Sequence, residues 1–320
     1  MPRSLSPMPA VAAAFALCMT GAAHAADDPV VLAPASQWQL DLGEDNCRIS
    51  RLFGDTEKPH LFFLEQWSPS SNADWRVSGP ELDRYRLPGE IRFSFGPEGD
   101  DGSYEALKST LGDFGTVVGS GSTVAKNNHP PIPELAKLRE KSKGEAQRGQ
   151  APDEGPMTAA KLSLDAEQAA GVSSLTVGQN GRTDVMLQLG SMKAPLDAMN
   201  QCMDNLVKYW GLDVDEQKSV ARTARFDNLS EIAREIQKSY PSKALVRGAQ
   251  ANFAFRVIIS EDGKIEQCKL LATTLAEEFQ FRKDACDAVV KIGEASPAIA
   301  VSGKPVRSYI FTRINYRIPK

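Results

Sequence analysis

Histidine is scarce in this sequence, which has three in 320 residues: His24, His60 and His129. Hydrolases of the Ser-His-Asp and Cys-His kinds need a histidine beside the nucleophile. His60 opens an apolar stretch, His129 lies in the stretch NNHPP, and neither is near a Gly-x-Ser-x-Gly turn. The sequence therefore predicts that this is not an enzyme. An unrecognised catalytic site near His60 is kept as the third of three hypotheses.

Concentrated charge and ligand-binding motifs are also missing. The net charge is −4 with Lys and Arg scattered along the chain, which argues against a nucleic-acid partner. The acidic stretches at Asp100-Asp101 and Asp213–Glu216 lack the ligand spacing of a calcium loop, and the Gly-rich stretch 118–126 lacks the ending of a phosphate loop. The sequence predicts no metal and no cofactor.

Long apolar runs are absent except near the N-terminus, where one extends from about Ala10 to Ala23. A lone Arg3 precedes it and the triplet Ala23-His24-Ala25 follows, which is the layout of a cleaved secretory signal. We expect a signal peptide over 1–25, cleaved before Ala26, and a periplasmic protein without a stable membrane anchor. Retention of the segment as an anchor is the alternative.

Cysteine is also sparse, with five in the chain. Loss of the signal would remove Cys18 and leave an even set in an oxidising compartment, which favours two disulfides. If Cys268 and Cys286 pair with each other, Cys47 is the remaining partner of Cys202. Zinc is disfavoured because close Cys-x-x-Cys spacing and neighbouring histidines are missing.

The region 26–212 has the signals of a β-rich unit. Aromatic and β-branched clusters between Val30 and Pro97 predict an antiparallel meander, and 119–171 is expected to be a flexible insertion. Beyond it, Asn180-Gly181 lies between two alternating runs and predicts a hairpin. An amphipathic helix then ends at Gly211 with Cys202 on its buried face. We infer one fold unit built from both sides of the insertion.

After a predicted linker over 213–227, residues 228–320 read as a small α+β module. A helical period ending near Pro241 is followed by the alternating run ANFAFRVIIS, the turn Asp262-Gly263 and a returning strand. A second helix places Cys286 inward, and the run PVRSYIFTRINYRI predicts a long terminal strand. The whole chain is therefore expected to be α+β.

Residues from about Ser239 to Ile318 resemble the C-terminal domain of TonB, the periplasmic energy transducer of Gram-negative bacteria. The resemblance rests on Tyr240-Pro241, FRVIISEDGKIEQCKLL, SPAIAVSGKPV and the closing YIFTRINYRI, in the order and approximate spacing of the family. It covers about a quarter of the chain. Upstream the chain departs from the family, because a β-rich region replaces the Pro-rich spacer and the N-terminal segment reads as cleavable.

The resemblance implies an exposed terminal strand, about 308–318, to which a segment of a receptor adds as a further strand. The positions that match the family's contacts are Tyr240, Pro241, Tyr309, Phe311, Arg313 and Tyr316. The alternative is that these aromatics only pack or protect the edge. In the family pattern Cys268 lies inside the second strand, so its bond to Cys286 would fasten a helix to the sheet of a module with a limited core.

The resemblance thus implies a periplasmic protein that binds another envelope protein, such as a TonB-dependent receptor, as an accessory to TonB-type outer-membrane transport. The second hypothesis is a structural role in the envelope or a homodimer formed through sheet edges.

Overall fold

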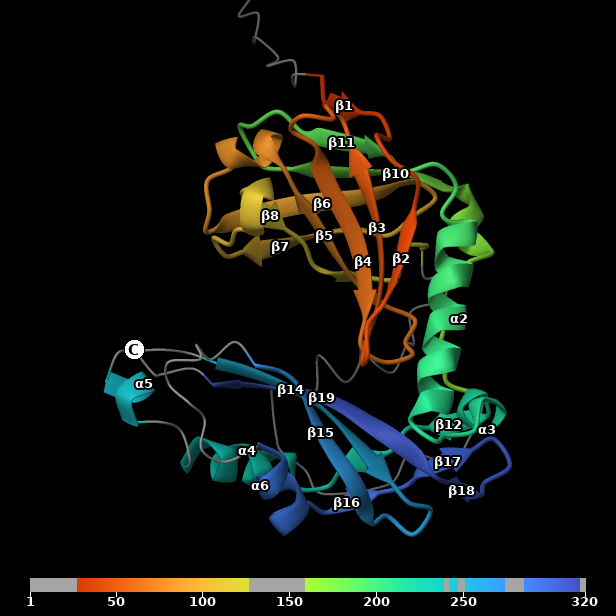
Figure 1. Cartoon of the computed structure of the whole chain (residues 1–320). Helices are drawn as coiled ribbons and strands as arrows, with labels where there is room; N and C mark the ends of the chain where they lie inside the picture. The colour runs from red at the N-terminus through yellow and green to blue at the C-terminus, as the bar shows by residue number, and fades with distance from the viewer. Residues whose placement is uncertain (1–27, 127–158, 239–241, 247–250, 274–284, 317–320) are drawn as a thin grey trace, which may run out of the picture.

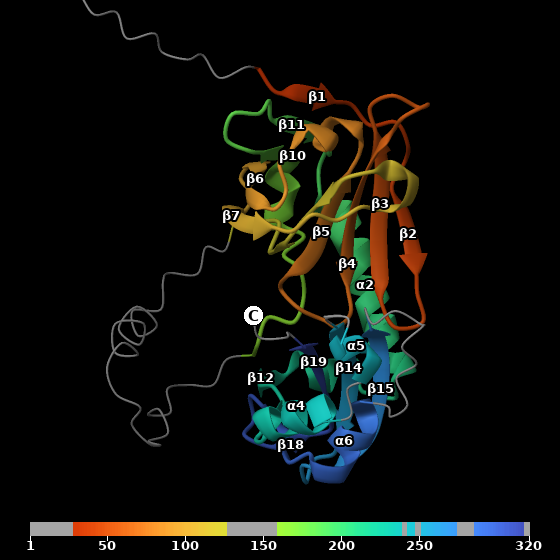
Figure 2. The same ribbon diagram turned by 90° about the vertical axis from the view of Figure 1, so that its left-hand side faces the viewer.

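The computed structural model describes residues 28–126, 159–238, 242–246, 251–273 and 285–316. These residues form two hydrophobic cores. The larger core draws on positions from Leu32 to Leu212 together with Ile258, and the smaller one on positions from Val220 to Ile310. We call the parts built around them the N-terminal domain and the C-terminal module. They are stacked one above the other, and a long helix runs down one side of both (Figure 1, Figure 2). The α+β class expected from the sequence is confirmed.

The N-terminal domain consists of two sheets. The strand order of the first is β2-β3-β4-β5-β8, with β9 also pairing with β5, and that of the second is β1-β11-β10-β6-β7. Short 3-10 helices lie at Pro80–Arg84, Gly112–Phe114 and Gln168–Gly171. The strands of the first sheet are β2 (Gln39–Leu42), β3 (Cys47–Phe53), β4 (His60–Gln66), β5 (Ala73–Ser78), β8 (Val117–Val118) and β9 (Gly121–Ser122). Those of the second are β1 (Val30–Leu32), β6 (Gly89–Pro97), β7 (Asp101–Ala106), β10 (Val172–Gly178) and β11 (Val185–Gln188).

The predicted meander holds for β2 to β5 and is wrong at β6, which belongs to the second sheet. The alternation of buried and exposed residues along β6 explains why this strand joins the second sheet. Every second residue is buried, and all of the buried residues lie on one face of the strand. Two of these residues, Phe93 and Phe95, meet the fully buried Trp75 of β5 at ring-centroid distances of 5.2 and 6.1 Å. Because the aromatic rings need cover from both sides, the strands separate into two facing layers.

Both sides of the predicted insertion contribute to this domain, as the sequence indicates. β10 pairs with β6, and β11 pairs in parallel with β1. Gly181 has φ +72° in the connection between β10 and β11, as the Asn-Gly signal predicts. The boundaries 119 and 171 are wrong, because β9 pairs with β5 and Val124 and Ala169 are buried at the two ends. These short segments contain Gly and Ser, and their apolar and polar residues do not alternate, so the sequence did not indicate that they are ordered. Residues 127–158 lie outside the described part.

Helix α2 (Lys193–Tyr209) connects the two parts. Its buried stripe includes Met199, Cys202 and Leu206, and Gly211 with φ +74° follows its end. Cys202 forms a disulfide with Cys47 on β3, with 6.2 Å between the two Cα atoms. The helix is thereby fastened to the first sheet.

The predicted linker over 213–227 is instead ordered structure. It forms α3 (Val214–Lys218), β12 (Val220–Arg222) and β13 (Arg225–Phe226). β12 pairs with β17 (Ala298–Ala300), and β13 pairs with β16 (Ala295–Ser296). Their partners lie far along the chain, so the local sequence gave no sign of these short strands.

The C-terminal module is a three-stranded antiparallel sheet with helices on one face. The strand order is β15-β14-β19, and a small accessory strand β18 (Pro305–Val306) pairs with β17. The sheet strands are β14 (Ala251–Ile259), β15 (Ile265–Thr273) and β19 (Ser308–Tyr316). The helices are α4 (Leu229–Lys238), α5 (Ser242–Val246) and α6 (Ala285–Ile292). As predicted, Asp262-Gly263 forms the turn between β14 and β15, with φ +81° at Gly263.

A second disulfide joins Cys268 of β15 to Cys286 of α6, with 5.5 Å between the Cα atoms. The two disulfides are the same pairs that the sequence favours, one in each part of the molecule.

We expect the Cys268–Cys286 bond to stabilise the module against opening. Replacing both residues by Ala should lower the free energy of opening of the β14 amides by about 3 kcal/mol, the chain-entropy value for a loop of this length. Hydrogen exchange of the oxidised protein measures it. The amides of β3 and β4, followed in the same exchange experiment, serve as a control for the N-terminal domain. Unchanged protection of β14 would contradict the expectation.

Candidate functional site

Strand β19 lies at an edge of its sheet. It pairs with β14 over nine residue pairs, from Ser308 opposite Ile259 to Tyr316 opposite Ala251. Among the described residues no strand pairs with its other side. An edge strand of this length presents a row of backbone N–H and C=O groups that another extended chain can bind.

The side chains of β19 alternate between two environments. Ile310 and Ile314 belong to the smaller core beneath α4 and α6. Tyr309 and Arg313 point to the opposite face, where both contact the N-terminal domain. The sheet is therefore covered on both faces, by helices on one side and by the N-terminal domain on the other (Figure 1).

The contact between the two parts is centred on Arg256 of β14, which is 7% exposed. Its guanidinium lies 4.2 Å from the ring centroid of Trp210, and its Nη1 is 3.1 Å from Oδ1 of Asp45. Asp45, in the turn between β2 and β3, also pairs with Lys269 of β15 at 2.9 Å. Burial lowers the pKa of Arg256, and the adjacent Asp45 carboxylate opposes this shift. The guanidinium therefore keeps its charge inside the contact because a carboxylate and an aromatic face accompany it.

Tyr309 belongs to the same contact. Its hydroxyl donates to the backbone oxygen of Pro69 at 3.3 Å, and its ring meets Trp210 edge-on at 5.4 Å. Burial raises the pKa of Tyr309. Its ring packs inside the molecule, which agrees with the alternative that some of these aromatics only pack.

The other predicted contact residues are placed differently. Arg313 is exposed and its Nη2 donates to Oδ2 of Asp74 on β5 at 2.8 Å, while Phe311 is half-buried beneath the Arg313 guanidinium. Tyr240 and Pro241 lie outside the described residues. Tyr316 closes β19, and its side chain is also outside the described part. The structure thus brings Tyr309, Phe311 and Arg313 onto one face, and their contact with a partner stays a prediction.

Sequence reasoning did not single out Arg256, Asp45, Trp210 or Asp74, although together they join the two parts. One signal was present. Arg256 interrupts the apolar run FAFRVII, and a charge within such a run indicates either contact with solvent or a buried partner. The register of β14 alone cannot distinguish the two cases.

His60 is buried and takes a structural position. It is 3% exposed, and its Nε2 accepts the backbone N–H of Glu81 at 3.2 Å. Burial lowers its pKa, although the nearby carboxylates of Glu81 and Asp83 raise it. The described residues contain no group of three His, Cys, Asp or Glu side chains that could hold a metal ion. The acidic residue Asp213 caps α3 by accepting the backbone N–H of Glu216.

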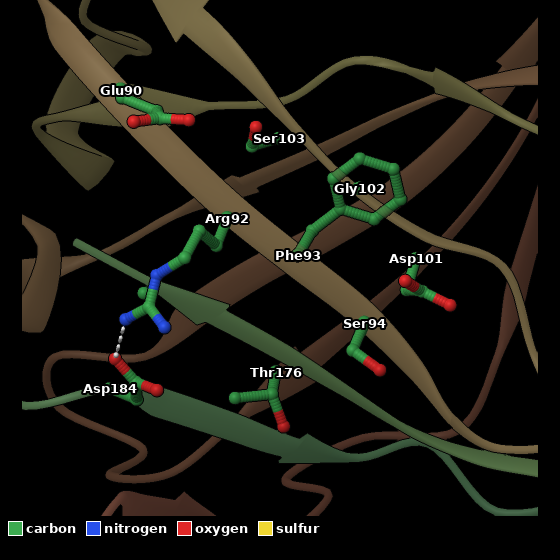
Figure 3. A pocket seen from close by; sticks show the side chains of 10 residues that line it. Glu90, Arg92, Phe93, Ser94, Asp101, Gly102, Ser103, Thr176 and Asp184 are labelled. Carbon is green, nitrogen blue, oxygen red and sulfur yellow. Dashed lines mark hydrogen bonds and ion pairs between the residues drawn. The ribbon is translucent and has the colours of Figure 1, made fainter. Parts of the chain in front are cut away.

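A hollow of about 500 Å³ lies on the outer face of the second sheet (Figure 3). Its walls are the outward-pointing side chains of β6, β7 and β10, and Arg92 reaches across to Asp184 at 3.5 Å. Short hydroxyl side chains and charges of both signs alternate there without a histidine or cysteine. The hollow is a polar sheet face with no pairing of a nucleophile and a base.

Residues 236–318 match the family described as Gram-negative bacterial TonB protein C-terminal. The match covers about a quarter of the chain, and it contains β14, β15, α6 and β19. A search among curated proteins finds no match. TonB C-terminal domains are protein-interaction domains of the envelope and are not enzymes.

Asp45 should be needed for the contact between the two parts. Asp45→Asn leaves the buried Arg256 charge without its carboxylate and should destabilise the protein by about 3 kcal/mol in urea unfolding. Glu44→Gln is the matched control, since Glu44 touches the same Lys269 but is largely exposed. Equal stability of the two variants would show that the contact does not depend on this pair.

The buried His60 should make stability depend on pH. Because its folded pKa lies below the unfolded value, the unfolded chain takes up the proton first and stability falls as the pH drops. His60→Gln should reduce the loss of stability measured between about pH 8 and pH 5, the range in which histidine titrates. An unchanged slope in the variant would show that other groups carry the pH dependence.

Proposed function

We propose that this chain, whose residues 236–318 form a TonB C-terminal domain, binds another envelope protein by taking up a segment of it as an added strand. The free edge of β19 would receive that strand, and the protein would act as an accessory to TonB-type outer-membrane transport. A TonB-dependent receptor segment is the partner that the family favours.

The observation that supports this proposal is the unpaired side of β19 among the described residues. Both faces of the sheet are covered, so its backbone edges are what the module can still offer to a partner. Strand addition uses such an edge for affinity and alternate side chains for selection. In this chain Phe311 and Arg313 lie on one face of β19, where they could contact alternate side chains of an added strand.

The proposal places the protein in the periplasm. Two disulfides are characteristic of an oxidising compartment. Within the described residues no helix is long and apolar enough to cross a membrane.

A homodimer is the alternative, and one observation favours it. Strand β15 lies at the other edge of the same sheet, and the described part contains no strand that pairs with its outer side. Two copies could pair edge to edge through β15 or β19. Sedimentation at increasing protein concentration separates this alternative from a heterologous partner.

Proline substitutions in β19 test strand addition. Deleting the strand would also remove Ile310 from the core, so a milder change is needed. The backbone N–H groups of neighbouring residues in a strand point to opposite edges. One of the two variants Phe311→Pro and Thr312→Pro therefore removes a hydrogen bond to β14. The other removes an N–H group only from the free edge. We expect the first to lose stability, and the second to fold but lose crosslinking to its partner in the envelope.

The variants Phe311→Ala and Thr312→Ala are the controls, because they remove the same side chains and keep both N–H groups. Crosslinking at the wild-type level by the proline variant that still folds would contradict strand addition at β19.

A further inference from the structure

A cleft of about 150 Å³ is lined by residues that precede the C-terminal module in the chain, and we call it the β19 cleft. Its apolar wall is formed by Pro69, Leu162, Val207 and Val214. The walls come from the loop after β4, from the stretch 160–163, from α2 and from α3. The volume is well below the ~300–1,000 Å³ of sites for small molecules. It is suited to one side chain.

The β19 cleft adjoins the first residues of β19. Pro69, in its wall, accepts the hydroxyl of Tyr309 at 3.3 Å. Gln217, also in its wall, accepts the Ser308 hydroxyl at 2.6 Å and donates to the backbone oxygen of Arg307 at 2.8 Å. These bonds hold the start of the strand against the cleft. In Figure 2 the chain beyond residue 158 climbs from the module to the N-terminal domain near β19.

The charged residues around the cleft are paired with one another. Lys218 binds Asp204 at 2.6 Å, and Lys161 is paired with Asp165. Neither lysine is left to attract an anionic group, and the Asp204 carboxylate is neutralised. The chemistry of the cleft therefore favours an uncharged aliphatic side chain over a charged one.

Strand geometry decides which residue of an added strand would reach the cleft. Residues directly opposite each other on neighbouring strands point to the same face of the sheet. Tyr309 points toward the N-terminal domain and reaches Pro69. A partner residue opposite Tyr309 would point the same way, toward Pro69 in the wall of the cleft. Residues one position away would point toward the smaller core.

We infer that the β19 cleft is a selectivity pocket, and that the partner is an extended segment with Val, Leu or Ile at the position opposite Tyr309. The inference rests on the proposed strand addition. It adds that the N-terminal domain takes part in recognition, because it supplies Pro69 and Val207 to the pocket. A TonB C-terminal domain alone would lack this wall.

The test uses a displayed library of random nine-residue peptides, selected on the mature full-length chain. The selected peptides should share one aliphatic position. In a synthetic copy, Ala at that position should weaken binding about tenfold, as expected for loss of a buried aliphatic side chain. Ser163→Trp, which fills the cleft from an exposed position, should remove the difference between the Leu and Ala peptides. Ala170→Trp, exposed but away from the cleft, is the matched control and should keep it.

N-methylation of the peptide at alternate residues separates the two levels of the proposal. One set of N-methyl groups should abolish binding and the other should not, if the peptide adds as a strand. Two results would contradict the role of the cleft as a selectivity pocket and leave strand addition intact. One is a selected peptide position that accepts Asp or Trp as well as Leu. The other is a preference for Leu over Ala that is unchanged in Ser163→Trp. Failure to select any peptide, or insensitivity to both sets of N-methyl groups, would overturn strand addition and the pocket with it.

Discussion

The way the N-terminal domain and the C-terminal module meet depends on the interactions of one buried guanidinium, that of Arg256. It lies in the middle strand of the small sheet, against Asp45 from one part of the chain and Trp210 from another. A charge removed from water is tolerated only where a partner neutralises it, so these three residues fix how the two parts meet. Ile258, two positions along the same strand, then belongs to the larger core.

This contact changes what a small three-stranded sheet can do. A sheet with helices on one face would ordinarily leave the other face to solvent or to a partner. Here the N-terminal domain covers that face and binds Tyr309 and Arg313. In the proposed strand addition, the partner therefore binds at the edge of β19 and not on a face of the sheet. The N-terminal domain becomes a neighbour of any strand that adds there.

The two disulfides support this division of roles. Cys47–Cys202 fastens α2 to the first sheet, and α2 carries Trp210 just beyond its end to the module. Cys268–Cys286 fastens α6 to the sheet from the opposite face. Each bond therefore holds one of the two layers between which β14 and β19 lie. If a partner strand adds at β19 as proposed, fewer residues around it have to be ordered on binding, which reduces the entropic cost.

The sequence by itself determined the parts whose signals are local. Alternation predicted β3 to β6, β14 and β19, helical period and Gly211 predicted α2, and the Asn-Gly and Asp-Gly pairs predicted two turns. The family pattern indicated β19 as the edge. Only the tertiary structure decided the crossing of β6 to a second sheet, the strands within 213–227 and the contact of Asp45 with Arg256, which are 211 positions apart. The periodicity of apolar residues along the chain indicates which residues are buried. Which segment covers them depends on packing between parts of the chain that are far apart in the sequence.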